Sequence, residues 1–236
     1  MSSGQLPSTE SCILQLAHAE ATKTAGGSLA RTLYTRPLTV LLHGELGSGK
    51  TTFFQGFAEA LGVKTHVTSP TFAIEQRYET TGHGELLHLD LFRLNADEAK
   101  NILQQSEAHQ GIRVVEWADR TQLPFSEPHI AIWLSESGSS RTLDCTFADM
   151  ALPGREEILE WRTHMELPEH IAQHCDAVAD FSTEFAEYFV KQSMFVRTVA
   201  LHKAAEVHDL LRFMDFRPGA GPAGAVDEEH AVWEEV

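Results

Sequence analysis

Apolar residues follow two kinds of pattern along the chain, and the change between them lies near Leu152. Before that point, short apolar runs at residues 38–42, 86–90 and 112–116 have the length and composition of buried strands. Such runs are typical of parallel strands that are covered by helices on both faces. The first part therefore predicts an α/β fold in which helices flank a sheet.

Other segments of the first part show helical or alternating spacing. Helices are predicted at residues 9–24 and 52–61 from their apolar periodicity. Residues 130–134 and 142–147 are predicted to form the two arms of a closing hairpin, because the second arm alternates and a Ser/Gly-rich stretch separates the two.

Strand patterns stop after the Leu-Pro-Gly sequence at residues 152–154. Helical periodicity then dominates at residues 155–165, 168–191 and 193–213, with short breaks between them. We expect two domains: an α/β domain at residues 1–152 and a smaller all-α module at residues 153–236.

Residues 44–52 read Gly-Glu-Leu-Gly-Ser-Gly-Lys-Thr-Thr, a complete G-x-x-x-x-G-K-[ST] phosphate loop between a predicted strand and a predicted helix. Its glycines let the backbone fold around an anion, so that amide hydrogens at the helix N-terminus point at phosphates. Lys50 would supply a charge to the β and γ phosphates, and the Thr51 hydroxyl a ligand to Mg²⁺. The predicted nucleotide contacts are Glu45, Leu46, Gly47, Ser48, Gly49, Lys50, Thr51 and Thr52.

Two of the predicted strands end in a carboxylate, Asp90 in one and Glu116 in the other. The C-terminal edge of an open α/β sheet is where ligands bind. Mg²⁺ keeps several waters, so one or two carboxylates beside the Thr51 hydroxyl suffice to hold it. Either carboxylate could instead be a strand-end cap that faces solvent.

Four motifs in this order resemble the TsaE (YjeE) family of ATPases: the phosphate loop, Ser-Pro-Thr-Phe at 69–72, His-Leu-Asp-Leu-Phe-Arg-Leu at 88–94 and Val-Glu-Trp at 115–117. The resemblance covers roughly residues 8–152. It implies an ATP- and Mg²⁺-using ATPase that acts with TsaB/TsaD-type transferase proteins. Together they make N6-threonylcarbamoyladenosine at position 37 of tRNAs that read codons beginning with A.

The resemblance also implies roles for single residues. Trp117 would lie beside the nucleotide, although a place in the hydrophobic core is an alternative. His88 matches a family position, but a half-buried polar group explains it equally, so we assign it no catalytic role. With no base apart from the acids, hydrolysis is expected to be slow unless partners complete the site. By resemblance, Lys50 and Thr51 bind phosphate and metal, Thr71 senses the γ-phosphate, Asp90 acts as a metal-linked acid or water organiser, and Glu116 completes the magnesium shell.

Charge and cysteine content indicate which partners and which cellular compartment to expect. The chain has 34 acidic and 18 basic residues, a net charge of −16 that opposes direct binding to tRNA. We therefore expect a partner protein to hold the tRNA. Three widely spaced cysteines suggest neither a disulfide framework nor a zinc site. We see no leader and no apolar span of membrane length, so we expect a cytoplasmic protein without membrane contact.

The second part carries a further candidate site. The sequences His-Cys-Asp-Ala-Val-Ala from His174 and Glu-Val-His-Asp-Leu-Leu around His208 and Asp209 resemble the start of an HD-domain metal phosphohydrolase. The resemblance, over roughly residues 168–236, implies that these three residues bind a divalent transition metal. A fourth aspartate is usual on a later helix, and Asp215 and Asp227 are too near in sequence to match it. The alternative is a scaffold with incomplete coordination or a truncated domain.

The leading hypothesis is an ATPase component of tRNA threonylcarbamoylation that resets its transferase partner, with a metal-dependent phosphohydrolase as a further possibility for the second part. One alternative is a small-molecule or nucleotide kinase with the same loop, although we find no arginine-rich lid. Another is a nucleotide-gated binding module whose hydrolysis is incidental.

Overall fold

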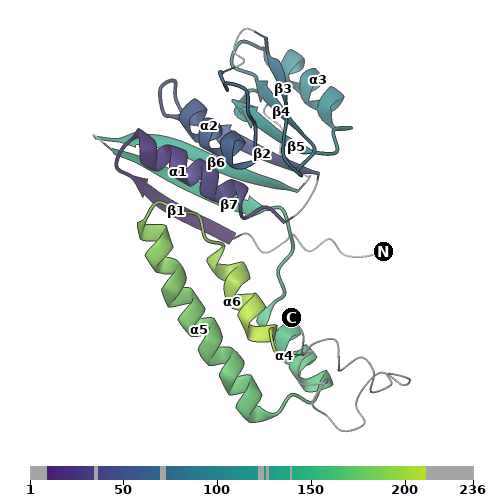
Figure 1. The fold of residues 1–236 in the computed structure, drawn as a ribbon. Coiled ribbons are helices and arrows are strands. Elements are labelled where there is room, and N and C mark those ends of the chain that lie inside the picture. Colours follow the sequence, from purple (N-terminus) through teal and green to yellow (C-terminus); the bar gives the residue numbers. More distant parts are fainter. Residues whose placement is uncertain are drawn as a thin grey trace. The chain divides into compact units, whose positions relative to one another are not determined.

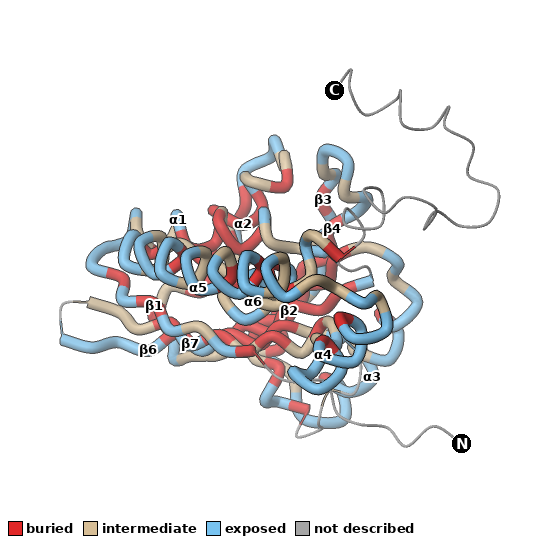
Figure 2. The backbone as a smooth tube through the Cα atoms, turned by 90° about the horizontal axis from the view of Figure 1, so that it is seen from below, coloured by how far each residue is buried: buried red, intermediate tan, exposed pale blue. Residues whose placement is uncertain are grey.

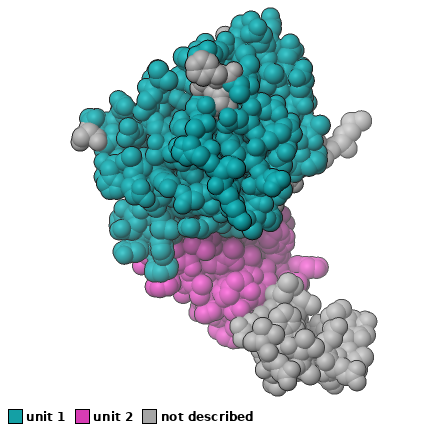
Figure 3. Space-filling model, turned by 45° about the horizontal axis from the view of Figure 1, so that its top comes forward, with its two compact units in different colours: residues 1–152, 185–198 teal, residues 153–184, 199–236 magenta. Residues whose placement is uncertain are grey.

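The protein is described here by a computed structural model, which describes residues 10–34, 37–69, 73–121, 125, 128–138 and 140–210. The chain divides into two compact units, residues 1–152 with 185–198 and residues 153–184 with 199–236 (Figure 3). This division differs from the expected one because residues 185–198 join the first unit. That the two units are separate domains stays a prediction.

The first unit has an α/β fold, as predicted. Its described residues form a seven-stranded sheet in the order β1-β7-β6-β2-β5-β4-β3 (Figure 1). The central strands β6, β2, β5 and β4 are parallel to one another, whereas β7, β1 and β3 pair antiparallel to their neighbours. The strands are β1 Glu10–Leu16, β2 Leu38–His43, β3 Glu75–Glu79, β4 Glu85–Asp90, β5 Ile112–Glu116, β6 His129–Ser137 and β7 Ser140–Ala148.

Both faces of the sheet are covered. On β2, Val40 packs into a core with the helices α1 (Ala19–Ala30) and α2 (Lys50–Ala60), whereas its neighbour Leu41 packs into a second core with α3 (Ala96–Ser106) and the 3₁₀ helix η1 (Ala118–Thr121). Successive side chains of a strand point to opposite faces, so a strand between two helical layers is apolar throughout. This explains the continuous burial along β2 (Figure 2) and along β5.

The strands predicted at 38–42, 86–90 and 112–116 and both hairpin arms are confirmed, as is the helix after the phosphate loop. The helix predicted at 9–24 is wrong in its first half, because Glu10–Leu16 is strand β1 and α1 starts only at Ala19. Leu14 and Leu16 are buried while Ile13 and Gln15 are exposed, the alternation of a strand that packs one face on a core. The imidazole of His18 then caps α1 by accepting the Ala21 amide hydrogen at 3.1 Å.

Helices α1 and α2 approach each other closely through glycines. A Cβ atom on Gly26 of α1 would lie 2.0 Å from the Phe53 carbonyl oxygen, and one on Gly56 of α2 would lie 2.0 Å from the Lys23 carbonyl oxygen. No side chain fits at either position. Because α2 begins at the phosphate loop, this contact fixes the helix that carries the loop against the rest of the unit.

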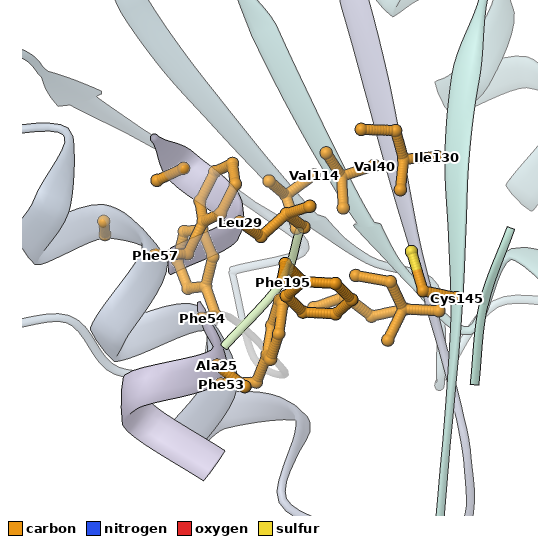
Figure 4. Close-up of a cluster of buried hydrophobic side chains, with 14 of the residues drawn as sticks. Ala25, Leu29, Val40, Phe53, Phe54, Phe57, Val114, Ile130, Cys145 and Phe195 are labelled. Atoms are coloured by element: carbon orange, nitrogen blue, oxygen red, sulfur yellow. The ribbon is translucent and has the colours of Figure 1, made fainter. Parts of the chain in front are cut away.

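The segment Phe185–Thr198 is part of the first unit's core. The Phe195 ring packs edge-on against Phe53 of α2, with centroids 6.4 Å apart (Figure 4), and against Phe147 of β7, with centroids 6.3 Å apart. Its amide donates a hydrogen bond of 2.8 Å to the Ser28 hydroxyl of α1. The segment therefore bridges two helices and the sheet, although the predicted domain boundary placed it with the second part.

A buried ionic cluster holds the end of this segment. The guanidinium of Arg197 donates two hydrogen bonds to the Asp149 carboxylate, at 2.9 and 2.8 Å, and lies 3.4 Å from the Glu10 carboxylate. All three side chains are buried. Removing one partner of such a cluster leaves an uncompensated charge inside the protein and is strongly destabilising.

Replacing Phe195 by alanine should destabilise the first unit by about 3–5 kcal/mol, the usual cost of truncating a buried phenylalanine. Tyr188→Ala is the matched control, since that aromatic side chain is 60% exposed on the same segment. Denaturant unfolding of both variants tests the packing. Equal stability of the two would show that Phe195 contributes nothing to the core.

In the described residues of the second unit all regular secondary structure is helical: α4 (Arg155–His164), α5 (Glu169–Lys191) up to Glu184, and α6 (Thr198–Val207) from Val199 onward. The side chain of Arg162 joins the three helices by donating to the Glu206 carbonyl oxygen at 2.8 Å and to the Asp176 carboxylate at 2.8 Å.

The predicted helix at 193–213 is wrong at its start: Ser193 has a φ of 60°, and the helix begins at Thr198. In the part of the chain that the structure describes, no helix combines the length and apolarity that a membrane crossing needs.

Candidate nucleotide-binding site

The phosphate loop joins the C-terminal end of β2 to the start of α2. Gly44, Gly47 and Gly49 have φ angles of 134°, 87° and 106°, values that side-chain-bearing residues rarely adopt. A Cβ atom on Gly44 would also lie 2.3 Å from the Leu134 carbonyl oxygen. The motif's glycines are therefore required by the backbone path, independently of any ligand.

Lys50 is held at the loop by several contacts. Its ammonium is largely buried and donates to the carbonyl oxygens of Gly44 at 2.7 Å and Glu45 at 3.0 Å. It also lies 4.1 Å from the centre of the Trp117 ring, a cation–π distance. Burial lowers the pKa of Lys50, while the nearby carboxylates, Glu116 first, act in the opposite direction. The loop thus presents a positive charge where the motif predicts one.

The two predicted carboxylates lie side by side. Asp90 and Glu116 are register partners at the ends of the parallel strands β4 and β5, and both are buried. The Asp90 carboxylate accepts hydrogen bonds from the Ser69 hydroxyl at 3.1 Å and from the Phe92 amide at 2.9 Å. Both carboxylates act electrostatically on Lys50, so the structure brings the loop and these strand ends into one site.

His88 has a place in this site that the sequence did not reveal. It is fully buried, its ring centroid lies 3.9 Å from that of Phe54 on α2, and its Nε2 is 3.1 Å from Oε1 of Glu116. His88 and Asp90 are two residues apart on β4 and share a face of the sheet. The two-residue spacing between His88 and Asp90, combined with the pairing of β4 and β5, would have identified His88 as a residue of the site.

Trp117 belongs both to the core and to the site. It packs against the second core cluster, contacts the Phe92 ring at 4.9 Å and covers the Lys50 ammonium with its face. Its φ of 61° is unusual for a side-chain-bearing residue, and its amide donates to the Leu42 carbonyl oxygen at 3.1 Å. This strained turn directs the ring over the loop.

The remaining predicted contacts lie on the loop and on the first turn of α2. Leu46 is exposed, whereas Ser48 is buried and Thr51 and Thr52 are partly buried. Thr71 lies outside the described residues. The available donors, two carboxylates and the Thr51 hydroxyl, are hard oxygen ligands of the kind that Mg²⁺ prefers, so the residues fit that ion.

In the second unit, the structure brings together the three predicted metal ligands. One ligand atom each from His174 of α5, His208 and Asp209 lie within 4.8 Å of one another. His208 Nδ1 donates to the Ala205 carbonyl oxygen at 2.7 Å, and its Nε2 lies 3.4 Å from the Asp209 carboxylate. Asp215 and Asp227 lie outside the described residues.

A parallel-centred sheet, a phosphate loop between strand and helix, and carboxylates on the neighbouring strand ends define an α/β protein of the P-loop class. The sequence model of the family described as "Threonylcarbamoyl adenosine biosynthesis protein TsaE" matches residues 16–143, more than half of the chain. The chain therefore belongs to the TsaE family.

Two relatives in sequence agree with this assignment. The chain is 33% identical to the Nostoc "tRNA threonylcarbamoyladenosine biosynthesis protein TsaE" over 57% of its own length and 88% of that protein. It is 37% identical to the Bacillus subtilis protein of the same name over 53% and 78% of the two chains. A solved structure described as "Crystal structure of Bacillus subtilus YdiB" is 25% identical, with a TM-score of 0.49 over 67% of this chain and 98% of that one.

Proposed function

We propose that this protein is a Mg²⁺-dependent ATPase that supports the formation of N6-threonylcarbamoyladenosine in tRNA together with TsaB/TsaD-type transferase proteins, in the cytoplasm. The observation that carries the proposal is the joining of Lys50, Asp90 and Glu116 at one phosphate loop in a chain of the TsaE family. The names of the relatives indicate the biological process, tRNA threonylcarbamoyladenosine formation. The geometry of the loop and the carboxylates supports ATP hydrolysis.

Each group has a defined task in this proposal. Loop amides and the Lys50 ammonium bind the phosphates, and Thr51, Asp90 and Glu116 hold Mg²⁺. When bound, the ion neutralises charge that develops on the phosphates. Thr71 senses the γ-phosphate. Ser69 of the same Ser-Pro-Thr-Phe motif donates a hydrogen bond to the Asp90 carboxylate, which supports this role.

Hydrolysis by the chain alone should be slow. Asp90 is the group best placed to orient a water, yet its carboxylate already accepts hydrogen bonds from Ser69 and Phe92. Phosphoryl transfer depends on positioning and on charge stabilisation, which a partner can complete in trans. A net charge of −16 also assigns the binding of tRNA to the partner.

The fate of the γ-phosphate separates this proposal from the kinase and binding-module alternatives. The chain is incubated with γ-labelled ATP, Mg²⁺ and a mixture of nucleotides and small-molecule alcohols as candidate phosphoryl acceptors, with and without the partner transferase, and the labelled products are separated. We expect free phosphate, released faster in the presence of the partner. Label on a small molecule would identify a kinase, and intact ATP under all conditions would identify a nucleotide-gated binding module.

A second candidate function has its own observation, the convergence of His174, His208 and Asp209 in the second unit. We propose that they bind a divalent transition metal, for which imidazole and carboxylate are suitable ligands, and that this unit is HD-like. If the unit is catalytic, the reaction would be a phosphohydrolysis.

His208→Ala should weaken Mn²⁺ or Zn²⁺ binding by at least about tenfold, since it removes one of three clustered ligands whose ring is oriented by the Ala205 carbonyl oxygen. His170→Ala is the matched control, because His170 is exposed on α5 and lies outside the cluster. Metal titration of both variants, followed by elemental analysis, gives the answer. Equal metal content in the parent and both variants would leave the unit as a scaffold.

A further inference from the structure

His88 is enclosed between helix α2 and the strand ends that carry the two acids. Its side chain is fully buried on β4, two residues before Asp90 and on the same face of the sheet. The centroid of its ring lies 3.9 Å from that of Phe54 on α2. Its Nε2 lies 3.1 Å from Oε1 of Glu116, whose side chain is also buried. The histidine therefore contacts both the helix that follows the phosphate loop and one of the acids.

The direction of the hydrogen bond between His88 and Glu116 follows from its chemistry. An ionised carboxylate only accepts hydrogen bonds, so Nε2 is the donor. Nδ1 of the same ring is buried and has no hydrogen-bond partner among the described residues. A buried polar atom without a partner costs free energy that an apolar side chain of similar size would not cost. The bond to Glu116 is therefore what a histidine provides at this position and an apolar residue would not.

This bond restrains a carboxylate that has a competing partner nearby. Of the carboxylates around Lys50, Glu116 acts most strongly on its charge. Opposite charges attract more strongly where water is excluded, so an unrestrained Glu116 side chain would turn toward the Lys50 ammonium. In the structure that ammonium donates instead to the carbonyl oxygens of Gly44 and Glu45. With Oε1 of Glu116 held by His88, the carboxylate stays in place for a metal ion.

The contact with Phe54 connects the same imidazole to the third group of the proposed metal site. Phe54 follows Thr51 by three residues on α2, a spacing that places both side chains on one side of the helix. The His88 ring thus lies between the helix that carries the Thr51 hydroxyl and the strand end that carries Glu116. Groups that hydrogen-bond a metal ligand from behind orient it, and their loss lowers metal affinity about tenfold to a hundredfold.

We propose that His88 is a positioning residue for Mg²⁺, which holds the Glu116 carboxylate for the ion through its hydrogen bond. This inference rests on the proposed function, in which Glu116 binds Mg²⁺. His88 touches neither the nucleotide nor the ion. It therefore acts on metal affinity, and through it on hydrolysis, and leaves the binding of metal-free nucleotide unchanged.

The test is a titration of Mn²⁺, a paramagnetic substitute for Mg²⁺, into the ADP complex of each protein, followed by electron paramagnetic resonance. His88→Phe keeps a ring against Phe54 but removes the donor, and should weaken Mn²⁺ binding about tenfold to a hundredfold. His88→Gln carries an amide donor that reaches Glu116 and should recover part of the affinity. His88→Asn is one methylene shorter and should behave like His88→Phe. ADP affinity without the ion, measured by calorimetry, should be parental in all three.

His109→Phe is the matched control. His109 precedes β5, and its Nδ1 lies 3.9 Å from Oε1 of Glu85, the first residue of β4. The control therefore removes a histidine–glutamate contact at the opposite ends of the same two strands. It should bind Mn²⁺ like the parent.

Parental Mn²⁺ affinity in His88→Phe would overturn the inference, and so would an equal loss in His88→Phe and His88→Gln with equally lowered unfolding midpoints. If His88→Phe does not fold, His88→Gln and His88→Asn decide the question, because equal Mn²⁺ affinities of these two would also overturn the inference. A parent protein that binds ADP but no Mn²⁺, or neither of them, would instead overturn the proposed function, and this inference with it.

Discussion

The Lys50→Ala variant is expected to lose ATP hydrolysis and to bind nucleotide about tenfold to a hundredfold more weakly than the parent. The loss of affinity follows because one charge-assisted hydrogen bond contributes roughly 1.5–3 kcal/mol to binding. The effect on hydrolysis is larger, since charge on the phosphates grows in the transition state. The Lys50 ammonium is already placed at the loop by two carbonyl oxygens and by the face of Trp117. Replacing Lys50 by alanine therefore removes the positive charge that these contacts hold at the phosphate loop.

Phosphate release and calorimetric binding of ATP measure this effect. Lys64→Ala is the matched control, because Lys64 is exposed and follows α2. Comparable unfolding midpoints of the two variants show that the loss concerns the site. Parental turnover by Lys50→Ala would remove the phosphate loop from the chemistry.

The second large effect is expected for Glu116→Gln, which should keep the fold and most nucleotide affinity but lose Mg²⁺-dependent hydrolysis. The amide preserves the shape of the side chain and an oxygen for His88 Nε2, yet it removes the negative charge that helps to hold the ion. Asp90→Asn should act in the same way. The two carboxylates are register partners, so each variant leaves one acid in place.

Hydrolysis is measured against Mg²⁺ concentration, and ADP binding is measured without the ion. Glu107→Gln serves as a control, since this exposed carboxylate follows α3 and is not part of the site. If Glu116→Gln and Asp90→Asn both hydrolyse ATP at the parental rate with the parental Mg²⁺ dependence, neither strand end holds the metal.

The central strands of the sheet could be predicted because burial on both faces leaves continuous apolar runs. The outer strands carry a weaker signal. In β1 the apolar residues Cys12, Leu14 and Leu16 alternate, but the helical pattern of the following residues obscured the alternation. In β3 only Tyr78 is buried, so the segment has the composition of a loop.

Helix α3 was not predicted although its signal is local. Asn95 and Glu98 form a capping box, with hydrogen bonds of 3.0 Å in both directions, and Ala99 is buried at the start of the apolar stripe. No local sequence pattern indicates that residues 185–198 pack with the first unit. Phe195 contacts Phe53 and Ser28, which are more than a hundred residues away, and no pattern specifies such a contact.

The candidate site shows the same limit. The motif identified Lys50, and the strand ends identified Asp90 and Glu116, because each signal is contained in a few consecutive residues. The role of His88 required the structure, because its contact with Glu116 depends on the pairing of β4 with β5.

The most direct test is a reconstitution with the partner transferase, tRNA and ATP, in which modified tRNA and released phosphate are measured together, with this protein present, absent or replaced by its Lys50→Ala variant. We predict repeated rounds of threonylcarbamoyladenosine formation, accompanied by phosphate release, only with the parent protein. Equal amounts of modified tRNA in all three reactions would contradict a role for this ATPase in the modification.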